Sequence, residues 1–535
     1  MFRPGDKDVQ KTLFDQDQAF PDYVVEMLKK SWAEDFYRLI LTQINEKRFS
    51  VLYSQKASRP NKPVNVLVSL LILKQQHIFS DEDLIGSLYF DYRFQYALGL
   101  EANADKERLC VNTLSNFRCR LVEHELQTGE NLLQQEMESL AEKMAYFLSL
   151  NKSMARMDST MLDSSCKKMT RIELVYTVIR NVVRELNKIP GLDIPASYLA
   201  YLEKGHKNQT IYKTKSTEEA SKLESLIHQA HDLHVWVQDA SVALDTDAFK
   251  HLARLLQEQS VESEDGITVP IEGTKLSSRI LQNPSDPDAT FRHKGGDHHI
   301  GNSLNLVEVH DPEKETGLIM HADLKENTHS DAQFGEDFVK EHPLADDIET
   351  LAVDGAYYRQ ETVKHADDKD LEINFSQLTG RSVSDDYIGV DQFEIDPETG
   401  KITRCPQGHE PTFPIYDAEK EIYTAKFYKE HCQQCPLLNQ CQVKEQKKAY
   451  HVSFSENKRR TDQTRAKIGT KRHQELSNFR AGVEGVPSVL KRAYRLEDLP
   501  VRGRVRPKIW LYASIIAQNF KRCTKHLKKM APATV

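Results

Sequence analysis

The chain has 535 residues, of which 39% are hydrophobic and 28% are charged, and its formal net charge is −8. This length allows two to four domains with their own cores, and the composition is typical of a soluble globular protein. The longest apolar stretch, Val64 to Leu73, is about half as long as a membrane span, and the first ten residues contain no apolar run. Eight cysteines in so long a chain argue against a disulfide scaffold. These features favour a cytosolic protein and exclude a membrane partner.

The charge is distributed unevenly along the chain. Residues 441–535 hold 23 Lys and Arg against 7 Asp and Glu, a local balance of +16, which leaves −24 for the remaining residues. Phosphate contacts come from local Lys and Arg, so a basic last fifth on an acidic body suits a nucleic-acid partner. A solvated basic tail is the alternative. The helical apolar stripe in KIWLYASIIAQNFKR, residues 508–522, disfavours it, because such a stripe must pack on something.

Residues 1–150 are expected to be helical, because DYVVEMLKKSWAEDFYRLILTQI and ENLLQQEMESLAEKMAYFLSL show spacing near 3.6. Between these stretches, residues 81–123 suggest a helix-turn-helix-like element. Its second helix would present Asn116, Arg118 and Arg120 to DNA, as a groove-reading helix does. An ordinary helical bundle would show the same pattern.

The middle of the chain alternates between extended and helical patterns. A short strand is expected at residues 155–162, with Asp158 at its middle, followed by a mostly helical stretch up to about residue 272. Residues 302–311 and 317–324 predict an antiparallel pair. A helix capped by Thr or Ser follows, and then an apolar strand that ends at Asp354-Gly355. An acid at the end of a buried strand, followed by glycine, is a frequent placement for a catalytic group.

A cysteine-rich stretch has the most specific spacing in the chain. Cys432 and Cys435 form a C-x2-C pair, with Cys441 six residues later and Cys405 upstream. Four thiolates suffice for a tetrahedral structural zinc site, in which His409 or His431 is a possible substitute for one thiolate. An iron–sulfur cluster and plain reduced cysteines remain the alternatives.

Three separate acids, Asp158, Asp354 and Glu484, could form one site. Carboxylates brought together bind hard divalent cations such as Mg²⁺ or Mn²⁺, and a two-metal site stabilises both the attacking and the leaving oxygen of a phosphodiester displacement. Arg480 and Lys491 share a helix face with Glu484 and would neutralise phosphate or hold a DNA strand. By itself, the Arg480–Glu484 spacing is equally typical of a surface i,i+4 ion pair.

The order of these motifs resembles that of bacterial insertion-sequence transposases of the DDE type, which have a ribonuclease-H-like core. One branch of that family carries Y-(2)-R-(3)-E-(6)-K around its third acid, and Arg480, Glu484 and Lys491 match the last three positions. Ser477 stands at the tyrosine position, which is a departure from the family pattern. Asp158 in MDST and Asp354 in VDGAYY match the first two acids. The segments NPSDPDATF, CQQCPL and IIAQNFKR add to the resemblance, which covers most of the chain from about residue 50.

The resemblance implies an α+β (mixed α/β) chain with a split catalytic core. The expected divisions are a helical DNA-binding domain (1–150), a ribonuclease-H-like core (151–164, 300–378 and 452–535), a mostly helical insertion (165–299) and a cysteine-rich insertion (379–451). The expected catalytic and Mg²⁺-binding residues are Asp158, Asp354 and Glu484; the DNA-binding residues are Arg480, Lys491, Arg118 and Arg120; and the zinc ligands are Cys405, Cys432, Cys435 and Cys441.

The activity implied by the resemblance is DNA transposition. The enzyme would bind the terminal inverted repeats of its element, cleave the ends by two-metal-ion hydrolysis and join the 3′-hydroxyls to target DNA. A homodimer would hold the two ends, and the protein would be cytoplasmic and associated with the bacterial nucleoid. Two alternatives are a domesticated or inactive DNA-binding protein and a metal-dependent nuclease without strand transfer.

Overall fold

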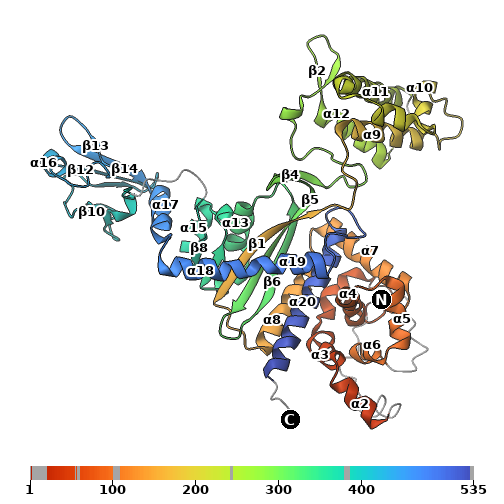
Figure 1. Ribbon diagram of the computed structural model, residues 1–535, viewed down its shortest axis with the longest axis horizontal. Helices are drawn as coiled ribbons and strands as arrows, with labels where there is room; N and C mark the ends of the chain where they lie inside the picture. The colour runs from red at the N-terminus through yellow and green to blue at the C-terminus, as the bar shows by residue number, and fades with distance from the viewer. Residues whose placement is uncertain are drawn as a thin grey trace.

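The computed structural model describes residues 2, 21–54, 56, 61–100, 109–240, 245–378 and 386–530. A central sheet lies between the N-terminal helices, a helical insertion and a cysteine-rich module (Figure 1). Its strands run in the order β6–β5–β1–β7–β8, with β4 also paired to β5. The strands are β1 (Met154–Asp163), β4 (Thr290–Lys294), β5 (Asp297–Asp311), β6 (Thr316–Glu326), β7 (Thr350–Val353) and β8 (Glu372–Phe375).

The strand directions are mixed. β1 and β6 are each antiparallel to β5, whereas β7 is parallel to both β1 and β8. The expected antiparallel pair and the expected strands around Asp158 and Asp354 are therefore confirmed. β4 was not foreseen, because it lies inside the residues assigned to the helical insertion, yet it pairs with the first residues of β5.

Both faces of the sheet are covered. Successive side chains of a strand point to opposite faces, and two neighbours on β1 show where each points. Asp158 contacts Arg480 of α18 (Lys471–Ala481), whereas Ser159 donates a hydrogen bond to Asp331 of α13 (Asp331–Glu341). α13 begins with the expected serine cap, because Ser330 accepts from the backbone of Gln333. It is followed by α14 (Leu344–Asp347), and α15 (Gln360–Asp367) connects β7 to β8.

The N-terminal helices share one apolar core with the sheet. They are α3 (Trp32–Leu39), α4 (Val64–His77), α5 (Asp81–Phe90), α6 (Tyr92–Ala97), α7 (Val111–Thr128) and α8 (Leu132–Phe147), and α2 (Asp22–Lys29) precedes them. α4 is apolar on nearly all sides, as suits a buried helix. The C-terminal helix α20 (Arg506–Met530) packs against α4, α8 and β6, and Phe520 meets Phe36 with ring centroids 5.3 Å apart. The expected packing of the last apolar stripe is thus confirmed.

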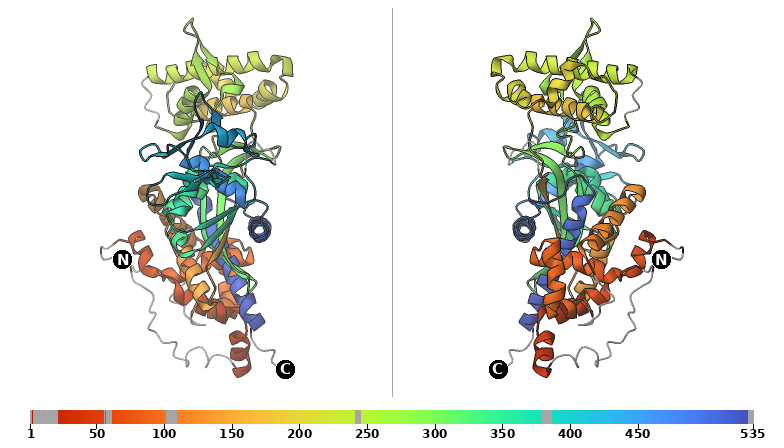
Figure 2. Two further views of the ribbon diagram at one scale, coloured as in Figure 1. Left: turned by 90° about the vertical axis from the view of Figure 1, so that its left-hand side faces the viewer. Right: turned by 90° about the vertical axis from the view of Figure 1, so that its right-hand side faces the viewer.

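The helical insertion has a separate core. It contains α9 (Arg171–Leu186), α10 (Ala196–Leu199), α11 (Glu219–Asp239) and α12 (Asp247–Gln259), and it projects away from the sheet in both side views (Figure 2). Residues 260–270, which were expected to belong to the mostly helical stretch, form a small hairpin instead, made of β2 (Ser260–Glu262) and β3 (Thr268–Pro270). The turn between the two strands contains Gly266, which has the positive φ that such a turn favours. The turn was not predicted because the residues around this glycine are mostly acidic.

A buried aspartate fastens this insertion to the rest of the chain. Asp286 is 2% exposed, accepts a hydrogen bond from Ser164 just after β1, and accepts another from the backbone of Gly503 just before α20. Three points that are distant in the sequence therefore meet at one carboxylate.

The cysteine-rich module has a third core and two small sheets. Its elements are β9 (Glu394–Ile395), β10 (Ile402–Arg404), β11 (Ile415–Asp417), β12 (Ile422–Phe427), α16 (Lys429–Gln433), β13 (Lys444–Glu445) and β14 (Tyr450–Ser455). The chain then continues through α17 (Glu456–Lys467), α18, the 3₁₀ turn η10 (Gly482–Glu484) and α19 (Gly485–Ala493). α18 crosses the central sheet beside β1, β7 and β8 (Figure 1).

Candidate active site

Two of the three predicted acids lie at the same level of adjacent parallel strands. Arg156 of β1 pairs with Ala352 of β7, so Asp158 and Asp354 each lie two residues beyond this matched pair. Asp354 follows the last residue of β7, and its Oδ1 accepts hydrogen bonds from Gly355 N at 2.6 Å and Ser376 Oγ at 3.1 Å. These bonds fix the carboxylate at the edge of the sheet.

Arg480 brings the third acid to the other two. Its Nη2 lies 3.0 Å from Asp158 Oδ1 and 4.0 Å from Asp354 Oδ2, and its Nη1 lies 2.7 Å from Glu484 Oε1. The Arg480 side chain is 13% exposed, so this guanidinium is enclosed by the carboxylates that it pairs with. The predicted i,i+4 pair is present, but it is one edge of a cluster rather than an isolated surface contact.

The helix is interrupted at Glu484 for a packing reason. α18 ends at Ala481, and the chain passes through η10 before α19 begins at Gly485. A Cβ on Gly482 would lie 2.1 Å from Arg156 Nη1, so a larger residue there would have to displace the Arg156 guanidinium, whereas a Cβ on Gly485 would meet nothing within 4 Å. Pro487 lies in the first turn of α19, where proline is tolerated. The glycine that permits close packing is therefore the one before Glu484, and not the one after it.

Arg156 of β1 links the central sheet to the last turn of α18. It donates from Nε to Glu308 of β5 at 2.6 Å and from Nη1 to the carbonyl oxygen of Phe479 at 2.9 Å. Arg522 of α20 also pairs with Glu308, which is 1% exposed. Sequence analysis did not single out these residues, because their partners lie more than 150 positions apart along the chain.

Burial has the largest effect on the pKa of Asp158. Burial raises the pKa of Asp158, and the nearby charges of Arg480 and Lys294 only partly oppose this. Lys294 lies on β4 and also pairs with Asp331, which is 4% exposed. Lys294 was not predicted, since β4 itself was not recognised as part of the sheet.

Lys491 faces the same opening as two of the acids. A cleft of about 260 Å³ is lined by residues of β1, η10 and α19, among them Asp158, Glu484 and Lys491. Nζ of Lys491 lies 3.4 Å from Glu497 Oε1, an exposed carboxylate. The structure thus assembles five of the predicted residues, Asp158, Asp354, Glu484, Arg480 and Lys491, in one place.

Arg118 and Arg120 lie elsewhere, on α7. Arg118 pairs with Asp81 at 2.5 Å, and hydrogen bonds from Arg118 and Lys74 hold the pKa of Asp81 at about 2. Its guanidinium also lies 5.5 Å from the centroid of the Trp510 ring, and its side chain is 13% exposed. Arg120 lies over Tyr53, at 4.9 Å. Residues 101–108 of the expected helix-turn-helix region are outside the described residues.

The four predicted zinc ligands are neighbours in the cysteine-rich module. Burial, and then the thiols of Cys441, Cys405 and Cys435, raise the pKa of Cys432 to about 11. Two tight turns accompany them, because Gly408 N donates to Cys405 O and Cys435 N donates to Cys432 O. Within the described chain, however, no three of their sulfur atoms lie within 4.8 Å of one another.

Another set of potential ligands does lie that close together: Glu138, His321 and His342. His321 Nδ1 is 2.6 Å from Glu138 Oε1, and His342 Nε2 is 3.6 Å from the same oxygen. The backbone N–H of Leu344 donates to His342 Nδ1, which leaves Nε2 as the ring nitrogen that faces the Glu138 carboxylate. Burial raises the pKa of Glu138, but its hydrogen bonds with the two histidines lower it to about 2. The polar groups of these three residues pair with one another where α8, β6 and the end of α13 pack together.

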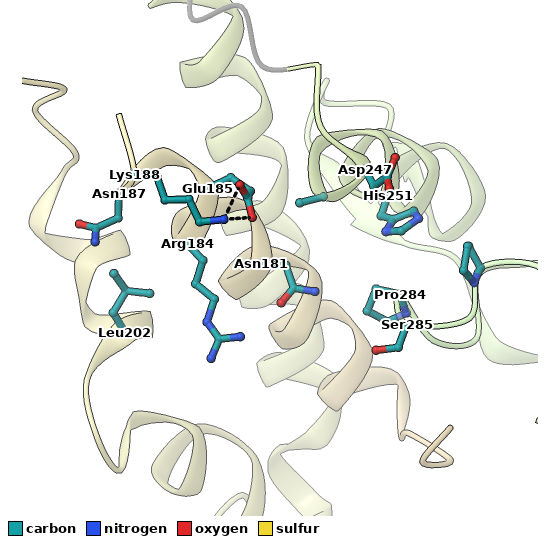
Figure 3. Close-up of a pocket in the computed structure, with 12 residues that line it drawn as sticks. Asn181, Arg184, Glu185, Asn187, Lys188, Leu202, Asp247, His251, Pro284 and Ser285 are labelled. Atoms are coloured by element: carbon teal, nitrogen blue, oxygen red, sulfur yellow. Dashed lines mark hydrogen bonds and ion pairs between the residues drawn. The ribbon is translucent and has the colours of Figure 1, made fainter. Parts of the chain in front are cut away.

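A larger cleft, of about 840 Å³, lies in the helical insertion between α9, α12 and residues 284–287 (Figure 3). Glu185 and Lys188 pair with each other on its wall. None of the predicted catalytic acids lines this cleft, so its size does not mark it as the active site.

Comparison with protein families gives two matches. Residues 404–524 match the family described as Transposase DDE domain, and residues 26–120 match the one described as Transposase domain (DUF772). Both matches support a similarity to insertion-sequence DDE transposases. Searches of curated proteins and of solved structures found no match.

The two matches cover different parts of the chain. The first spans most of the cysteine-rich module and the helices from α17 to most of α20, including Glu484. The second spans the helices from α2 to the middle of α7. Asp158 and Asp354 lie between the two matches, so their assignment rests on the geometry around Arg480. Among the described residues, none of the helices has the length and apolar character that a bilayer crossing requires.

Proposed function

We propose that this transposase binds the terminal inverted repeats of its insertion sequence, cleaves the element's ends and joins the resulting 3′-hydroxyls to target DNA. The observation that carries the proposal is the convergence of Asp158, Asp354 and Glu484 on the single guanidinium of Arg480. A surface ion pair would need one of these acids. Three acids from β1, the end of β7 and η10 suit a site that handles the charge of a phosphodiester.

The strand order supports a ribonuclease-H-like core. Three antiparallel strands, β6, β5 and β1, are followed by β7 and β8, which run parallel to β1. In this arrangement the first acid lies on the central strand and the second at the end of its parallel neighbour. A fold of this kind serves several nucleic-acid enzymes, so the reaction is argued from the site and not from the fold.

The three carboxylates fit Mg²⁺ or Mn²⁺. They offer only oxygen ligands, which hard cations prefer, and they already surround one positive charge, that of Arg480. Divalent ions held there would polarise the phosphodiester and activate water. Arg480 would have to leave at least part of this cluster as the metal ions enter, which frees its guanidinium for a DNA phosphate.

The residues around the acids have separate tasks in this proposal. Lys491 lines the cleft with Asp158 and Glu484, where its ammonium can contact a phosphate of the bound strand. Ser376 and the backbone of Gly355 keep Asp354 oriented. Lys294 lies near Asp158 and reduces the repulsion among the carboxylates.

The test is cleavage of labelled DNA that carries the element's own ends, in the presence of Mg²⁺ or Mn²⁺. We expect metal-dependent cutting by the wild type and none by Glu484→Gln, with DNA binding unchanged. Cutting by the variant would remove Glu484 from the site. DNA binding without cutting by either protein would favour a binding-only derivative, and cutting without joining of a pre-cut end would favour a nuclease.

The N-terminal helices and a second copy of the chain complete the proposal. Residues 1–150 would contact the terminal repeats, with Arg120 a better candidate than Arg118, which is engaged with Asp81. A homodimer in the DNA complex would hold both ends of the element. Cross-linking of the complex, followed by mass measurement, tests this stoichiometry.

We also propose that Cys405, Cys432, Cys435 and Cys441 hold one structural Zn²⁺. The nearness of the four thiols and their two tight turns support this, and the sulfur atoms would have to move closer to complete the site.

We expect about one zinc per chain by elemental analysis, and loss of this zinc in Cys435→Ser. Because metal binding by such a module contributes to its folding, chelation should increase proteolysis within residues 386–455. Cys166→Ser is the matched control, because Cys166 is half-buried outside the cluster. Full zinc content in Cys435→Ser would refute the assignment.

A further inference from the structure

A second, strongly basic cleft lies on the same face of the sheet as α18. It has a volume of about 230 Å³ and is lined by β1, β5, the turn into β6 and the last part of α20. Arg522, Lys525, His526 and Lys529 contribute from α20, at positions that share one helix face. No role in the proposed cleavage reaction has been assigned to this cleft.

Positive charge exceeds negative charge in the cleft. Arg156, Arg522, Lys525 and Lys529 face two carboxylates, those of Glu308 and Glu315. Glu308 is fully engaged, because Arg156 and Arg522 each bind one of its oxygens. Lys525 and Lys529 are exposed and form no ion pair with any described residue. The cleft therefore presents two ammonium groups that have no ion-pair partner among the described residues. The Glu308 carboxylate beside them is already bound by Arg156 and Arg522.

A buried imidazole adds an unsatisfied polar atom. His526 is 9% exposed, and its Nε2 is buried and has no hydrogen-bond partner in the described part of the chain. A buried polar atom without a partner is costly, so its presence on the wall of a cationic cleft indicates a site for an oxygen-rich anion. Mixed cations and neutral donors of this kind are typical contacts for a phosphate.

We propose that this cleft binds a phosphate of the DNA backbone, through Lys525, Lys529 and His526. The inference rests on the proposed function, since it takes DNA as the partner. It adds a contact in a cleft that shares no lining residue with the cleft of Lys491. α20 would thus have one half buried in the protein core and its C-terminal half against DNA.

The inference is tested by DNA binding without divalent metal, so that cleavage plays no part. The probe is a labelled duplex of arbitrary sequence, and the variant is Lys525→Gln/Lys529→Gln. Each lost phosphate contact lowers the slope of log K against log salt by about 1, so we expect a slope smaller by about 1 to 2 and binding about tenfold weaker at low salt.

The matched control is Lys521→Gln/Lys528→Gln, which removes the same charge from exposed positions of the same helix outside the cleft. The inference is supported if only the first pair weakens binding. Equal weakening by both pairs, or by neither, would overturn it while leaving the catalytic proposal intact. A wild-type protein that binds no DNA would overturn both.

Discussion

Replacing Asp158 by asparagine should abolish DNA cleavage while leaving the protein as stable as the wild type or more so. Asparagine keeps the size of the side chain but removes the charge that a metal ion requires, so we expect cleavage to fall by about 10³-fold or more. Burial raises the pKa of Asp158, which means that the folded state disfavours its ionised form. Removing that charge should raise the free energy of unfolding by up to about 1 kcal/mol.

Cleavage assays and thermal melting of the same preparation measure the two effects. Asp163→Asn is the matched control, because Asp163 lies on the same strand, is 37% exposed and pairs with Lys168 and His299 outside the acid cluster. It should keep its activity. An Asp158→Asn protein that still cleaves would exclude this carboxylate from the reaction.

The raised pKa of Asp158 also predicts how stability and cleavage activity depend on pH. Because the folded-state pKa of Asp158 is raised, protonation of this group favours folding, and that contribution is lost as pH rises through the folded-state pKa. Metal binding needs the ionised form, so activity should fall on acidification at a higher pH than an ordinary aspartate, with its pKa near 3.8, would give. A pH–rate profile at subsaturating Mg²⁺, where protons compete with the metal for Asp158, measures this fall.

Replacing Glu308 by glutamine should be the most destabilising of the proposed changes. Glu308 is 1% exposed, and both of its oxygens are bound by guanidinium groups, one from Arg156 and one from Arg522. Removing the charge leaves two largely buried cations without compensation, for which a loss of about 3 to 5 kcal/mol is expected. Because Arg156 also holds the backbone of α18 at Phe479, cleavage should fall as well.

Denaturant unfolding of Glu308→Gln and Glu185→Gln tests this prediction. Glu185 pairs with Lys188 on the surface of the helical insertion, with side-chain exposures of 32% and 68%, so its loss should cost less than about 1 kcal/mol. Similar losses in the two variants would show that the buried network does not hold the sheet and its helices together.

Local patterns in the sequence singled out the three acids as candidates, and the resemblance to DDE transposases joined them into one expected site. Each acid follows from a short-range feature: an alternating strand at Asp158, a strand that ends in Asp-Gly at Asp354, and an i,i+4 pair at Glu484. The structure brings all three together at Arg480. What the local patterns did not contain was the position of Arg480 between them, because that depends on where α18 crosses the sheet.

Errors arose where a residue's environment is set by distant parts of the chain. Arg118 has the spacing of a DNA-reading residue, but Asp81 and Trp510 enclose it. β4 was not predicted because it has only five residues, and its extended conformation depends on pairing with β5. The room available at Gly482 also depends on a distant residue, because a Cβ there would meet the Arg156 guanidinium.

The split arrangement of the site also bears on how the protein is made. Asp158 is synthesised early, but the helix that carries Glu484 follows 326 residues later, and α20, which packs across the sheet, is the last helix of the described chain. At 5 to 20 residues per second, a ribosome needs about 16 to 65 s to cover that interval. During this time β1 lacks the Arg480 contact that compensates its acid. A nascent chain that has not yet reached Arg480 and Glu484 therefore holds Asp158 without its partners, and under the proposed function we expect such a chain not to cleave DNA.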